Sequence, residues 1–571
     1  MMLYIIFLLL LPYFSNGISI YKQEKLLESL NESLKDESLS KDFCDICKTT
    51  MTHVVEMARN GTDIADIEDY ILKRCLKEET QLPFVCEGLV ANFTDEGVFV
   101  LKQTNYTANH ICGAFVKDCS ATDDPLNDMW RFVVPLGKPP VKGWPKVTNP
   151  QSTLRVLHLT DIHIDHEYSP GAEAKCKTKS GEKLLCCRVY PSVNNSKIKV
   201  PAGYWGSPYD CDIPYRTFVN AIEHISKNDK FDYIIVTGDM ESHDVWAYSK
   251  IKTMTNVLNI TSVLQEYFPK TPIYQATGNH EGVPMDALGH HSMQEYSKRG
   301  PAWLYNTFAQ AWKRDLPTDT QSDIKYRASY AIKPFSGLKI ISLNTIYCSK
   351  NNLYNYINQT DPDDTMSWLA TELFESEKIS EKVHIISHIP PGSSYCLKGW
   401  SFNFYNVVYR FEDTITALIY GHTHKDSFEI YYENADVNGR PYHVNFVAPS
   451  LTTDSHNNPA FRVYTIDGNY QGSSYTILES ETYYANLTEA DEYNPPKWKL
   501  EYKLKEDFGM KDLSPASFHE LANILNNEID VFQKFYTYYN RNHKDCNNEC
   551  RRNIICGLRS ARSYDKATLC P

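Results

Sequence analysis

Five apolar runs of the chain end in side chains that could bind metal ions. These side chains are Asp161 and His163, Asp239, Asn279 and His280, His388, and His422 and His424. Carboxylate, amide and imidazole groups together suit divalent cations such as zinc, iron or manganese. A D-x-H pair, a Gly-Asp turn or a lone histidine is common in any protein, so these segments carry meaning only as a set.

The elements that must bring this set together are strands. Short apolar runs alternate with helix-like stretches, which predicts an α/β or layered sheet domain. Strand ends in such folds meet at one edge of the sheet, where active sites lie. Glycines directly before Asp239, Asn279 and His422 allow the chain to turn sharply at that edge. The sequence therefore predicts one site built from five distant segments.

The order D-x-H, G-D, G-N-H-E, H and G-H-x-H resembles that of the calcineurin-like metallophosphoesterases. The resemblance implies an α/β metallophosphoesterase core at residues 152–480, a two-layer β-sandwich flanked by helices. It also implies two metal ions, and the oxidising compartment inferred below favours two Zn²⁺. The implied ligands are Asp161, His163 and His424 for one ion, Asn279, His388 and His422 for the other, and Asp239 as the bridge.

The same resemblance implies the chemistry. A metal-activated hydroxide attacks phosphorus, and a histidine general acid protonates the leaving alkoxide. His280 matches the general acid of the family. His243, in "GDMESHDVW", is a second catalytic candidate, which could instead orient His280, bind phosphate or simply pack in the core.

The N-terminal sequence and the cysteines point to export. Residues 1–17 read as a signal peptide, with an uncleaved anchor as the alternative. The 571 residues allow two to four domains, and 16 cysteines, an even number, suit an oxidising compartment. Eight sequons predict a glycosylated, secreted or lysosomal protein. They are Asn31, Asn60, Asn92, Asn105, Asn194, Asn259, Asn358 and Asn486.

Six cysteines and amphipathic stretches at residues 41–123 predict an all-α, disulfide-stapled module. This region resembles saposin B-type domains, which engage lipid through the apolar inner face of a helical clasp. A zinc site at the opening C-x2-C and a helical spacer without a lipid role are the alternatives. The pairing that the resemblance implies is Cys44–Cys119, Cys47–Cys112 and Cys75–Cys86.

Two further regions frame the core. Residues 124–151 form a proline-rich linker, because five prolines between Val134 and Pro150 exclude a helix or a central strand. Residues 481–571 are expected to form a helical, cysteine-bearing subdomain. Its clearest helix begins with Ser514 as N-cap and Pro515 at the first position.

The whole arrangement resembles the acid sphingomyelinase family. Stretches such as "GYWGSPYDCDIPYRT", "KVHIISHIPPG" and "YTIDGNYQGSSY" extend the resemblance beyond the ligands. It implies hydrolysis of sphingomyelin to ceramide and phosphocholine at a phospholipid membrane surface, in a lysosomal or secreted setting. It also implies pairs among the other ten cysteines, which are Cys176–Cys186, Cys187–Cys211, Cys348–Cys396, Cys546–Cys550 and Cys556–Cys570.

The net charge of the chain limits which classes of partner the protein is expected to bind. The formal charge of −13 argues against nucleic acid, and no obligate protein partner is evident. Protonating all 18 histidines would shift the charge to −13 + 18 = +5, so acidic pH weakens repulsion from anionic lipid.

Two alternatives to a sphingomyelinase remain open. One is a phosphodiesterase for nucleotides or other phospholipids, and the other is a catalytically inactive, saposin-type lipid-binding protein. Headgroup choice is expected to depend on loops near the metals, where Asp286 and Asp454 could meet a choline cation or simply be solvated.

Overall fold

The computed structural model describes residues 37–77, 81–116, 119, 128–176, 184–190, 198–541 and 546–570. The predicted signal peptide and the sequons at Asn31 and Asn194 lie outside the described residues. Within these ranges, no helix is both long and apolar enough to cross a bilayer.

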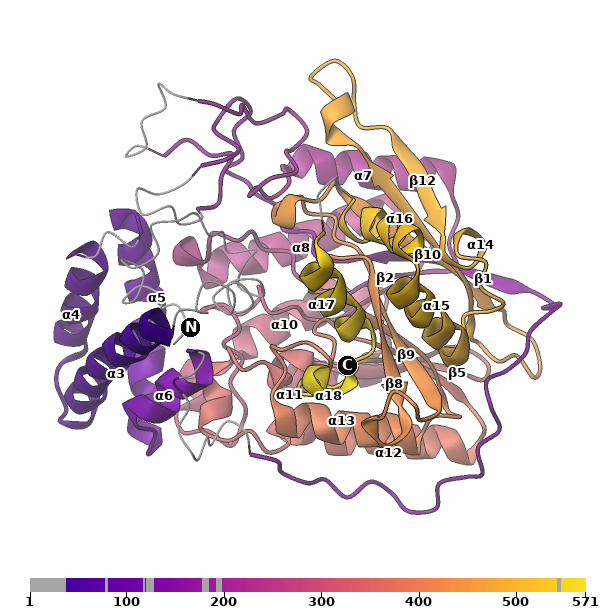
Figure 1. Ribbon diagram of the computed structural model, residues 1–571, viewed down its shortest axis with the longest axis horizontal. Helices are drawn as coiled ribbons and strands as arrows, with labels where there is room; N and C mark the ends of the chain where they lie inside the picture. The colour runs from indigo at the N-terminus through magenta and orange to yellow at the C-terminus, as the bar shows by residue number, and fades with distance from the viewer. Residues whose placement is uncertain are drawn as a thin grey trace.

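Four helices form the N-terminal module, on the left of Figure 1. They are α3 (Glu37–Arg59), α4 (Ile64–Lys77), α5 (Pro83–Gln103) and α6 (Ala108–Phe115). Their three disulfides are Cys44–Cys119, Cys47–Cys112 and Cys75–Cys86, which confirms the implied pairing. The cysteines are therefore joined to one another, which removes the alternative of a zinc site at the C-x2-C pair.

Helix α5 joins this module to the rest of the chain. Most of its apolar residues are buried, whereas Pro83, Glu87 and Ala91 are exposed along one side. Phe99 of α5 packs edge-on against Tyr354 of the core, and Phe84 packs in the same way against Trp246. The amide of Asn92 donates to the carbonyl oxygens of Val245 and Trp246 at 3.3 and 3.1 Å.

These contacts place the half-buried side chain of Asn92 between the module and the core. Glycosylation of this sequon stays a prediction.

The linker has neither helix nor strand over residues 128–150, as predicted. It runs along the lower edge of the core in Figure 1 and is tied to α13 (Lys398–Arg410). Asn403 donates to the carbonyl oxygen of Trp130 at 2.8 Å, and Arg410 donates to that of Pro135 at 2.7 Å. The linker is thus a strap bound to the core.

The core contains two six-stranded mixed sheets, which confirms the predicted two-layer sandwich. The first has the order β12-β11-β10-β1-β2-β3, and the second has the order β4-β5-β6-β7-β9-β8. The strands are β1 (Thr153–Leu159), β2 (Tyr233–Val236), β3 (Ile273–Gln275), β4 (Tyr330–Phe335), β5 (Leu338–Ser342), β6 (Lys382–Ile386), β7 (Ile415–Tyr420), β8 (Ser427–Tyr432), β9 (Pro441–Val447), β10 (Ala460–Asp467), β11 (Ile477–Ala485) and β12 (Trp498–Lys503).

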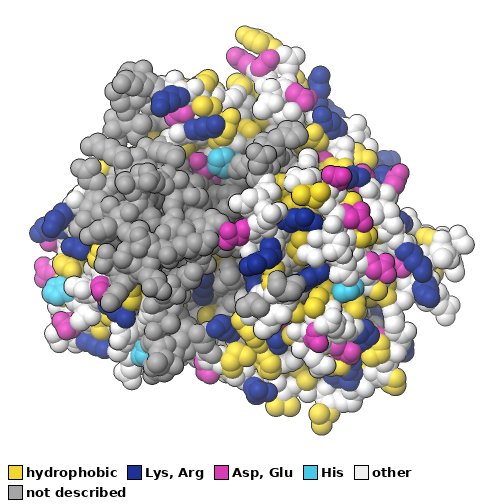
Figure 2. Space-filling view, in the orientation of Figure 1, with side chains coloured by type: hydrophobic (Ala, Val, Ile, Leu, Met, Phe, Trp, Pro, Cys, Tyr) yellow, Lys and Arg dark blue, Asp and Glu magenta, His cyan; other side chains and the backbone are white. Residues whose placement is uncertain are grey.

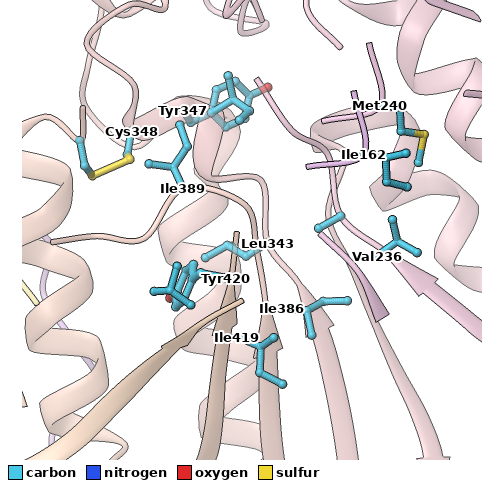
Figure 3. Close-up of a cluster of buried hydrophobic side chains, with 14 of the residues drawn as sticks. Ile162, Val236, Met240, Leu343, Tyr347, Cys348, Ile386, Ile389, Ile419 and Tyr420 are labelled. Atoms are coloured by element: carbon cyan, nitrogen blue, oxygen red, sulfur yellow. A yellow bond between two sulfur atoms is a disulfide. The ribbon is translucent and has the colours of Figure 1, made fainter. Parts of the chain in front are cut away.

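Strands β1, β2 and β3 are parallel to one another, as are β5, β6, β7 and β9. The central strands are continuous apolar runs because both of their faces are covered. Figure 3 shows side chains of both sheets in one cluster, with Val236 from the first sheet and Ile386 and Ile419 from the second. Flanking helices include α7 (Tyr215–Asn228), α8 (Lys250–Tyr267), α10 (Ala302–Ala311), α11 (Gln321–Arg327) and α12 (Thr365–Lys378).

The C-terminal boundary differs from the expected residue 481. Strand β11 spans that position and pairs with β12, so the first sheet continues to Lys503. The alternating "WKLEYK" of β12 suits an edge strand with one face in solvent.

The C-terminal helices begin only after β12. They are α14 (Leu504–Asp507), α15 (Pro515–Asn527), α16 (Ile529–Asn540), α17 (Asn548–Leu558) and α18 (Lys566–Leu569). Ser514 caps α15 as predicted, by accepting from the amide of Ser517. The expected long helix is divided at Glu528, whose backbone is extended. Helix α15 packs against β8 and β9, so this region covers the second sheet (Figure 1).

The other five disulfides also match the implied pairs. They are Cys176–Cys186, Cys187–Cys211, Cys348–Cys396, Cys546–Cys550 and Cys556–Cys570. On the face in Figure 2, the described acidic and basic side chains are interspersed, and neither sign forms one large area.

Candidate metal centre

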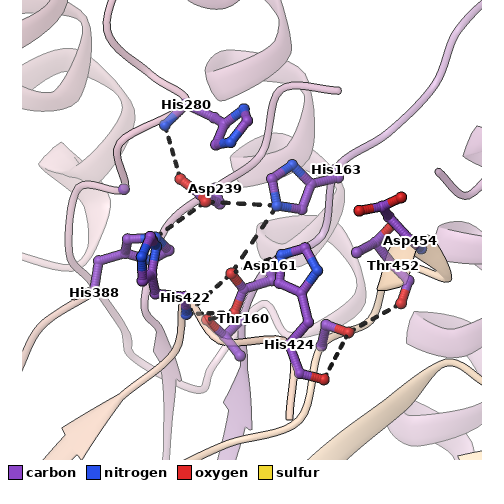
Figure 4. A network of polar contacts seen from close by, with 12 residues as sticks. Thr160, Asp161, His163, Asp239, His280, His388, His422, His424, Thr452 and Asp454 are labelled. Atoms are coloured by element: carbon purple, nitrogen blue, oxygen red, sulfur yellow. Dashed lines mark hydrogen bonds and ion pairs between the residues drawn. The ribbon is translucent and has the colours of Figure 1, made fainter. Parts of the chain in front are cut away.

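The five predicted segments meet at one edge of the two sheets (Figure 4). Each follows the carboxyl end of a strand, and these strands are β1, β2, β3, β6 and β7. Parallel pairing within each sheet aligns those ends, which is why donors from distant parts of the sequence converge. All seven predicted metal ligands are brought together, and His280 and His243 lie beside them.

Backbone strain accompanies this convergence. Five of the seven predicted ligands have φ between 41° and 71°, a region that costs a non-glycine residue about 1–3 kcal/mol. These five are Asp161, His163, Asp239, His422 and His424. The adjacent Gly421 has no alternative, because a Cβ atom there would lie 1.9 Å from Oγ1 of Thr160. The turns thus aim the side chains at a common point at the expense of local stability.

Two groups of donor atoms result. In the first, Oδ1 of Asp161 lies 3.4 Å from Nε2 of His424 and 4.0 Å from Nε2 of His163. In the second, Oδ1 of Asn279 lies 3.0 Å from both Nε2 of His388 and Nδ1 of His422.

Asp239 lies between the two groups. Its Oδ2 is 3.0 Å from Nε2 of His388 and 3.5 Å from Nε2 of His163. The position suits a carboxylate that contacts two cations at once.

Hydrogen bonds fix which ring nitrogen faces this centre. Nδ1 of His163 donates to the carbonyl oxygen of Glu241 at 2.6 Å, and Nδ1 of His388 donates to that of Thr237 at 2.7 Å. Each Nε2 therefore faces the centre, and in the neutral ring it carries the lone pair that a metal would bind. Among the described residues, Nε2 of His163 is buried without a hydrogen-bond partner. A cation would satisfy it, so the residues present fit a divalent metal.

The pKa values agree with ligands that are ready to bind metal. Burial lowers the pKa of His163 to about 4 and that of His422 to about 3, so both rings stay neutral. His388 differs, because Asp239 outweighs the opposing effect of burial and raises its pKa to about 9. Metal binding at His388 must therefore displace a proton.

Glu281 organises the loops that carry two of the ligands. Its carboxylate accepts hydrogen bonds from the amides of Gly278 at 2.6 Å, Met240 at 2.6 Å and Asp239 at 3.2 Å. It ties the turn after β2 to the turn after β3. The sequence placed this glutamate inside the G-N-H-E motif but gave it no role.

The two catalytic candidates lie on one side of the centre. The rings of His243 and His280 lie 4.0 and 4.8 Å from that of His163, measured between centroids. Nδ1 of His243 is 2.8 Å from Oδ1 of Asp212, which also accepts from Thr452 at 2.8 Å. Burial tends to raise the pKa of Asp212, but His243 lowers it to about 2, so the pair combines an anion with a histidine.

Asp212 was missed in the sequence. It follows Cys211 in "DCDIPYR", and an acidic residue next to a cysteine carries no metal or catalytic pattern. Only the fold places it against His243, 31 positions further along the chain.

The two acidic loop residues have different surroundings. Oδ2 of Asp454 lies 3.9 Å from Nε2 of His243, and Asp454 groups with His243 and His424 at the rim of the centre. Asp286 is buried, accepts from Ser349 at 2.7 Å and donates its amide to the carbonyl oxygen of Asn279. Asp454 is thus placed to meet a ligand, whereas Asp286 supports the loop that carries Asn279.

Comparison with known proteins extends these observations. The calcineurin-like phosphoesterase family matches residues 154–426, and the acid sphingomyelin phosphodiesterase C-terminal region matches residues 440–568. Sphingomyelin phosphodiesterase 2 of Caenorhabditis elegans is 45% identical over 562 residues, which covers 95% of this chain and 90% of that protein. The chain belongs to the sphingomyelin phosphodiesterase family. The Homo sapiens sphingomyelin phosphodiesterase is 35% identical over 539 residues, covering 92% of this chain and 82% of that protein.

Membership of the sphingomyelin phosphodiesterase family indicates which reaction class this group of residues serves. The chain is a hydrolase with a metallophosphoesterase fold, which implies divalent metal, and its histidine and aspartate groups could hold such ions. Eight disulfides, with no free cysteine among the described residues, indicate a protein of the secretory pathway.

Proposed function

We propose that this protein hydrolyses sphingomyelin to ceramide and phosphocholine with two zinc ions, at acidic pH, in the lysosome or outside the cell. The observation that carries the proposal is a complete set of seven ligand side chains with His280 and His243 next to them. A chain that had become a lipid-binding protein would have no reason to keep five of those ligands in strained conformations.

The compartment, rather than the ligand set, favours zinc in this proposal. Histidine nitrogen and carboxylate oxygen atoms suit zinc, iron and manganese alike, and an oxidising compartment favours the metal that has no redox chemistry. When bound, two such ions would polarise the phosphoryl group and supply the nucleophile for its hydrolysis.

The protein's own residues divide the remaining work. Asp239 and Asn279 hold the centre together, because Oδ1 of Asp239 accepts from the amide of His280 at 2.9 Å. In this proposal that bond holds His280 beside the reacting phosphorus, where its ring passes a proton to the departing ceramide oxygen. His243, held by Asp212, faces the same space and steadies the phosphate charge.

The N-terminal module supplies the contact with membrane lipid in this proposal. Its helix α5 is rich in apolar residues and lies between the other helices of the module and the core. A lipid drawn toward this module would therefore reach the core close to the turn at Trp246.

A substrate panel tests the proposal. The purified protein is incubated at pH 5 with sphingomyelin vesicles, a nucleotide or bis(4-nitrophenyl) phosphate, with and without added zinc, and its metal content is measured. We expect release of phosphocholine and about two zinc ions per chain. Cleavage of the nucleotide without cleavage of sphingomyelin would reject the proposal.

A further inference from the structure

The hydroxyl of Tyr248 makes two short hydrogen bonds next to the centre. It lies 2.6 Å from Nδ1 of His280 and 2.6 Å from the carbonyl oxygen of Ser242. Tyr248 is buried between the 3-10 turn Val245–Ala247 and Ser249, the N-cap of α8, so its ring is held by the packing of that turn. Nothing in the sequence distinguishes this tyrosine from the other 38.

The direction of the two bonds follows from proton counting. A hydroxyl has one hydrogen to donate, and the carbonyl oxygen of Ser242 can only accept. The hydroxyl hydrogen therefore goes to Ser242, and the hydroxyl oxygen accepts from Nδ1–H of His280. Burial keeps the pKa of Tyr248 well above its ordinary value, so this hydroxyl stays neutral.

We propose that Tyr248 is a positioning residue for phosphodiester hydrolysis, which fixes Nε2 of His280 as the nitrogen that donates a proton to the leaving group. This inference rests on the proposed function. With Nδ1 occupied by the Tyr248 hydroxyl, the ring cannot turn over without losing a short hydrogen bond, and Nε2 stays aimed at the substrate.

The atoms and protons of the hydrolysis step balance as follows from the groups named. Water adds its oxygen to phosphorus, the bond from phosphorus to the ceramide oxygen breaks, and the proton on Nε2 of His280 moves to that oxygen. The proton that water loses returns to Nε2 of His280 for the next turnover. Tyr248 exchanges no proton in this cycle and acts only through the geometry of the ring.

His243 and His280 have hydrogen-bond partners of different charge. This difference supports different roles for the two histidines in the reaction. His243 is held by the carboxylate of Asp212, whereas His280 is held by a neutral hydroxyl. A carboxylate favours retention of the imidazolium charge. The acceptor at Nδ1 of His280 is a hydroxyl and not a carboxylate, so it fixes the ring without adding a negative charge at that nitrogen.

Substrates whose leaving groups differ in basicity can distinguish a positioning role of Tyr248 from a purely structural one. A ceramide alkoxide needs a proton to depart, whereas 4-nitrophenolate is a stable anion that departs without one. Proton donation by a positioned acid contributes about 10²- to 10⁴-fold, so Tyr248→Phe is expected to lower kcat for sphingomyelin by about 10- to 100-fold. KM for sphingomyelin and kcat for bis(4-nitrophenyl) phosphate should stay within about twofold of the wild-type values, on the same reasoning.

Tyr405→Phe is the matched control. The hydroxyl of Tyr405 also donates to a backbone carbonyl oxygen and accepts a second bond, both at Tyr432, but it lies in α13, away from the centre. This variant should leave both activities unchanged. Metal content and the thermal unfolding midpoint are measured for each variant, so that loss of fold or metal is recognised.

A double variant closes the argument. If Tyr248 acts through His280, then Tyr248→Phe should cause no further loss in a His280→Ala background, because the residue it positions is gone. Equal loss on both substrates, full activity on sphingomyelin, or additive losses in the double variant would each overturn the role of Tyr248. If wild-type protein cleaves only other alkyl diesters, the proposed function fails, and the Tyr248 comparison is decided on the diester that is cleaved.

Discussion

The side chain of Arg541 donates a hydrogen bond to the backbone carbonyl oxygen of His424 at 2.9 Å, across 117 positions of sequence. Its Nε donates to the carbonyl oxygen of Asn458 at 3.0 Å, and Asn458 in turn donates to that of Arg541 at 2.9 Å. Arg541 ends helix α16 in a left-handed conformation and is buried. The C-terminal helical region thus holds the loop of a metal ligand in place.

Loss of this clamp should weaken metal binding. Arg541→Ala leaves the strained His424 loop without its buried donor, and second-layer changes of this kind cost about 10- to 100-fold in metal affinity. We expect the variant to lose metal at a lower chelator concentration than the wild type, as measured by residual metal after dialysis. Arg552→Ala, on the exposed side of α17, is the control and should retain its metal. Equal chelator sensitivity of both variants would show that the Arg541 bond does not support the centre.

Removing the ligand itself should abolish turnover of every substrate. His424→Ala deletes one donor of the first group, and catalytic metal stabilises charge in the transition state by several kcal/mol, or roughly 10³-fold in rate. Both sphingomyelin and bis(4-nitrophenyl) phosphate turnover should fall together, in contrast to Tyr248→Phe. His224→Ala, on helix α7, is the matched histidine control. Wild-type activity of His424→Ala with either substrate would reject the ligand assignment.

The ligands could be predicted because their signals are local. An apolar run, a glycine and a donor side chain occur together in sequence, and parallel pairing then brings the strand ends to one edge. His422 and His424 illustrate the limit of such a signal. Their H-x-H spacing suggests one shared ion, whereas the structure sends His422 toward Asn279 and His424 toward Asp161.

The residues that orient the catalytic histidines could not be predicted. Asp212 and Tyr248 contact their partners across 31 and 32 positions, through loops with no periodic pattern. The contacts of Asn92 were missed for the same reason, because its partners lie more than 150 positions away. Position in tertiary space, which decides all three cases, leaves no mark on the neighbouring sequence.

Docking of the N-terminal module depends on one buried cation. Arg299 lies 2.9 Å from Asp95 and 2.7 Å from Glu96 of helix α5, and only 6% of its side chain is exposed. Arg299 also pairs with Glu295 at 3.1 Å, so Arg299→Glu would bring four carboxylates together and replace attraction across this contact with repulsion. We expect turnover of sphingomyelin vesicles to fall at least tenfold while turnover of bis(4-nitrophenyl) phosphate stays within about twofold, since the soluble substrate needs no lipid contact.

The neighbouring Lys298→Glu variant is the control for Arg299. Its side chain is 66% exposed and pairs only loosely with Glu295, at 3.9 Å, so both activities should remain close to wild type. A parallel loss of both activities in Arg299→Glu would mean that docking supports the catalytic loops directly. The path for such an effect exists, because Tyr354 contacts Glu96 and also accepts from His290 near the Asn279 loop.

Stability should decrease as pH rises from the acidic range toward alkaline pH, and Glu501 is one source of this trend. Its Oε2 is buried without a hydrogen-bond partner among the described residues, and burial raises its pKa to about 8, although Arg541 opposes the shift. The ordinary pKa of 4.5 applies once the chain unfolds. Between these values the folded protein binds more protons than the unfolded chain, so the free energy of unfolding falls with increasing pH. The contribution of Glu501 is complete below about pH 4.5 and is lost as pH rises through about 8.

Thermal unfolding midpoints measured from pH 5 to pH 8, at constant metal saturation, test this expectation. The wild-type midpoint should decline across the range, and Glu501→Gln should flatten the decline, because glutamine stays neutral at every pH. Glu506→Gln, whose side chain is 74% exposed, should follow the wild-type curve. Asp212 does not contribute to the pH dependence of the unfolding midpoint in this range. Its pKa of about 2 keeps it ionised across the tested range, so its contribution is lost only as the pH falls below about 4. If Glu501→Gln and wild type show the same slope, the buried carboxyl of Glu501 does not favour the acidic range.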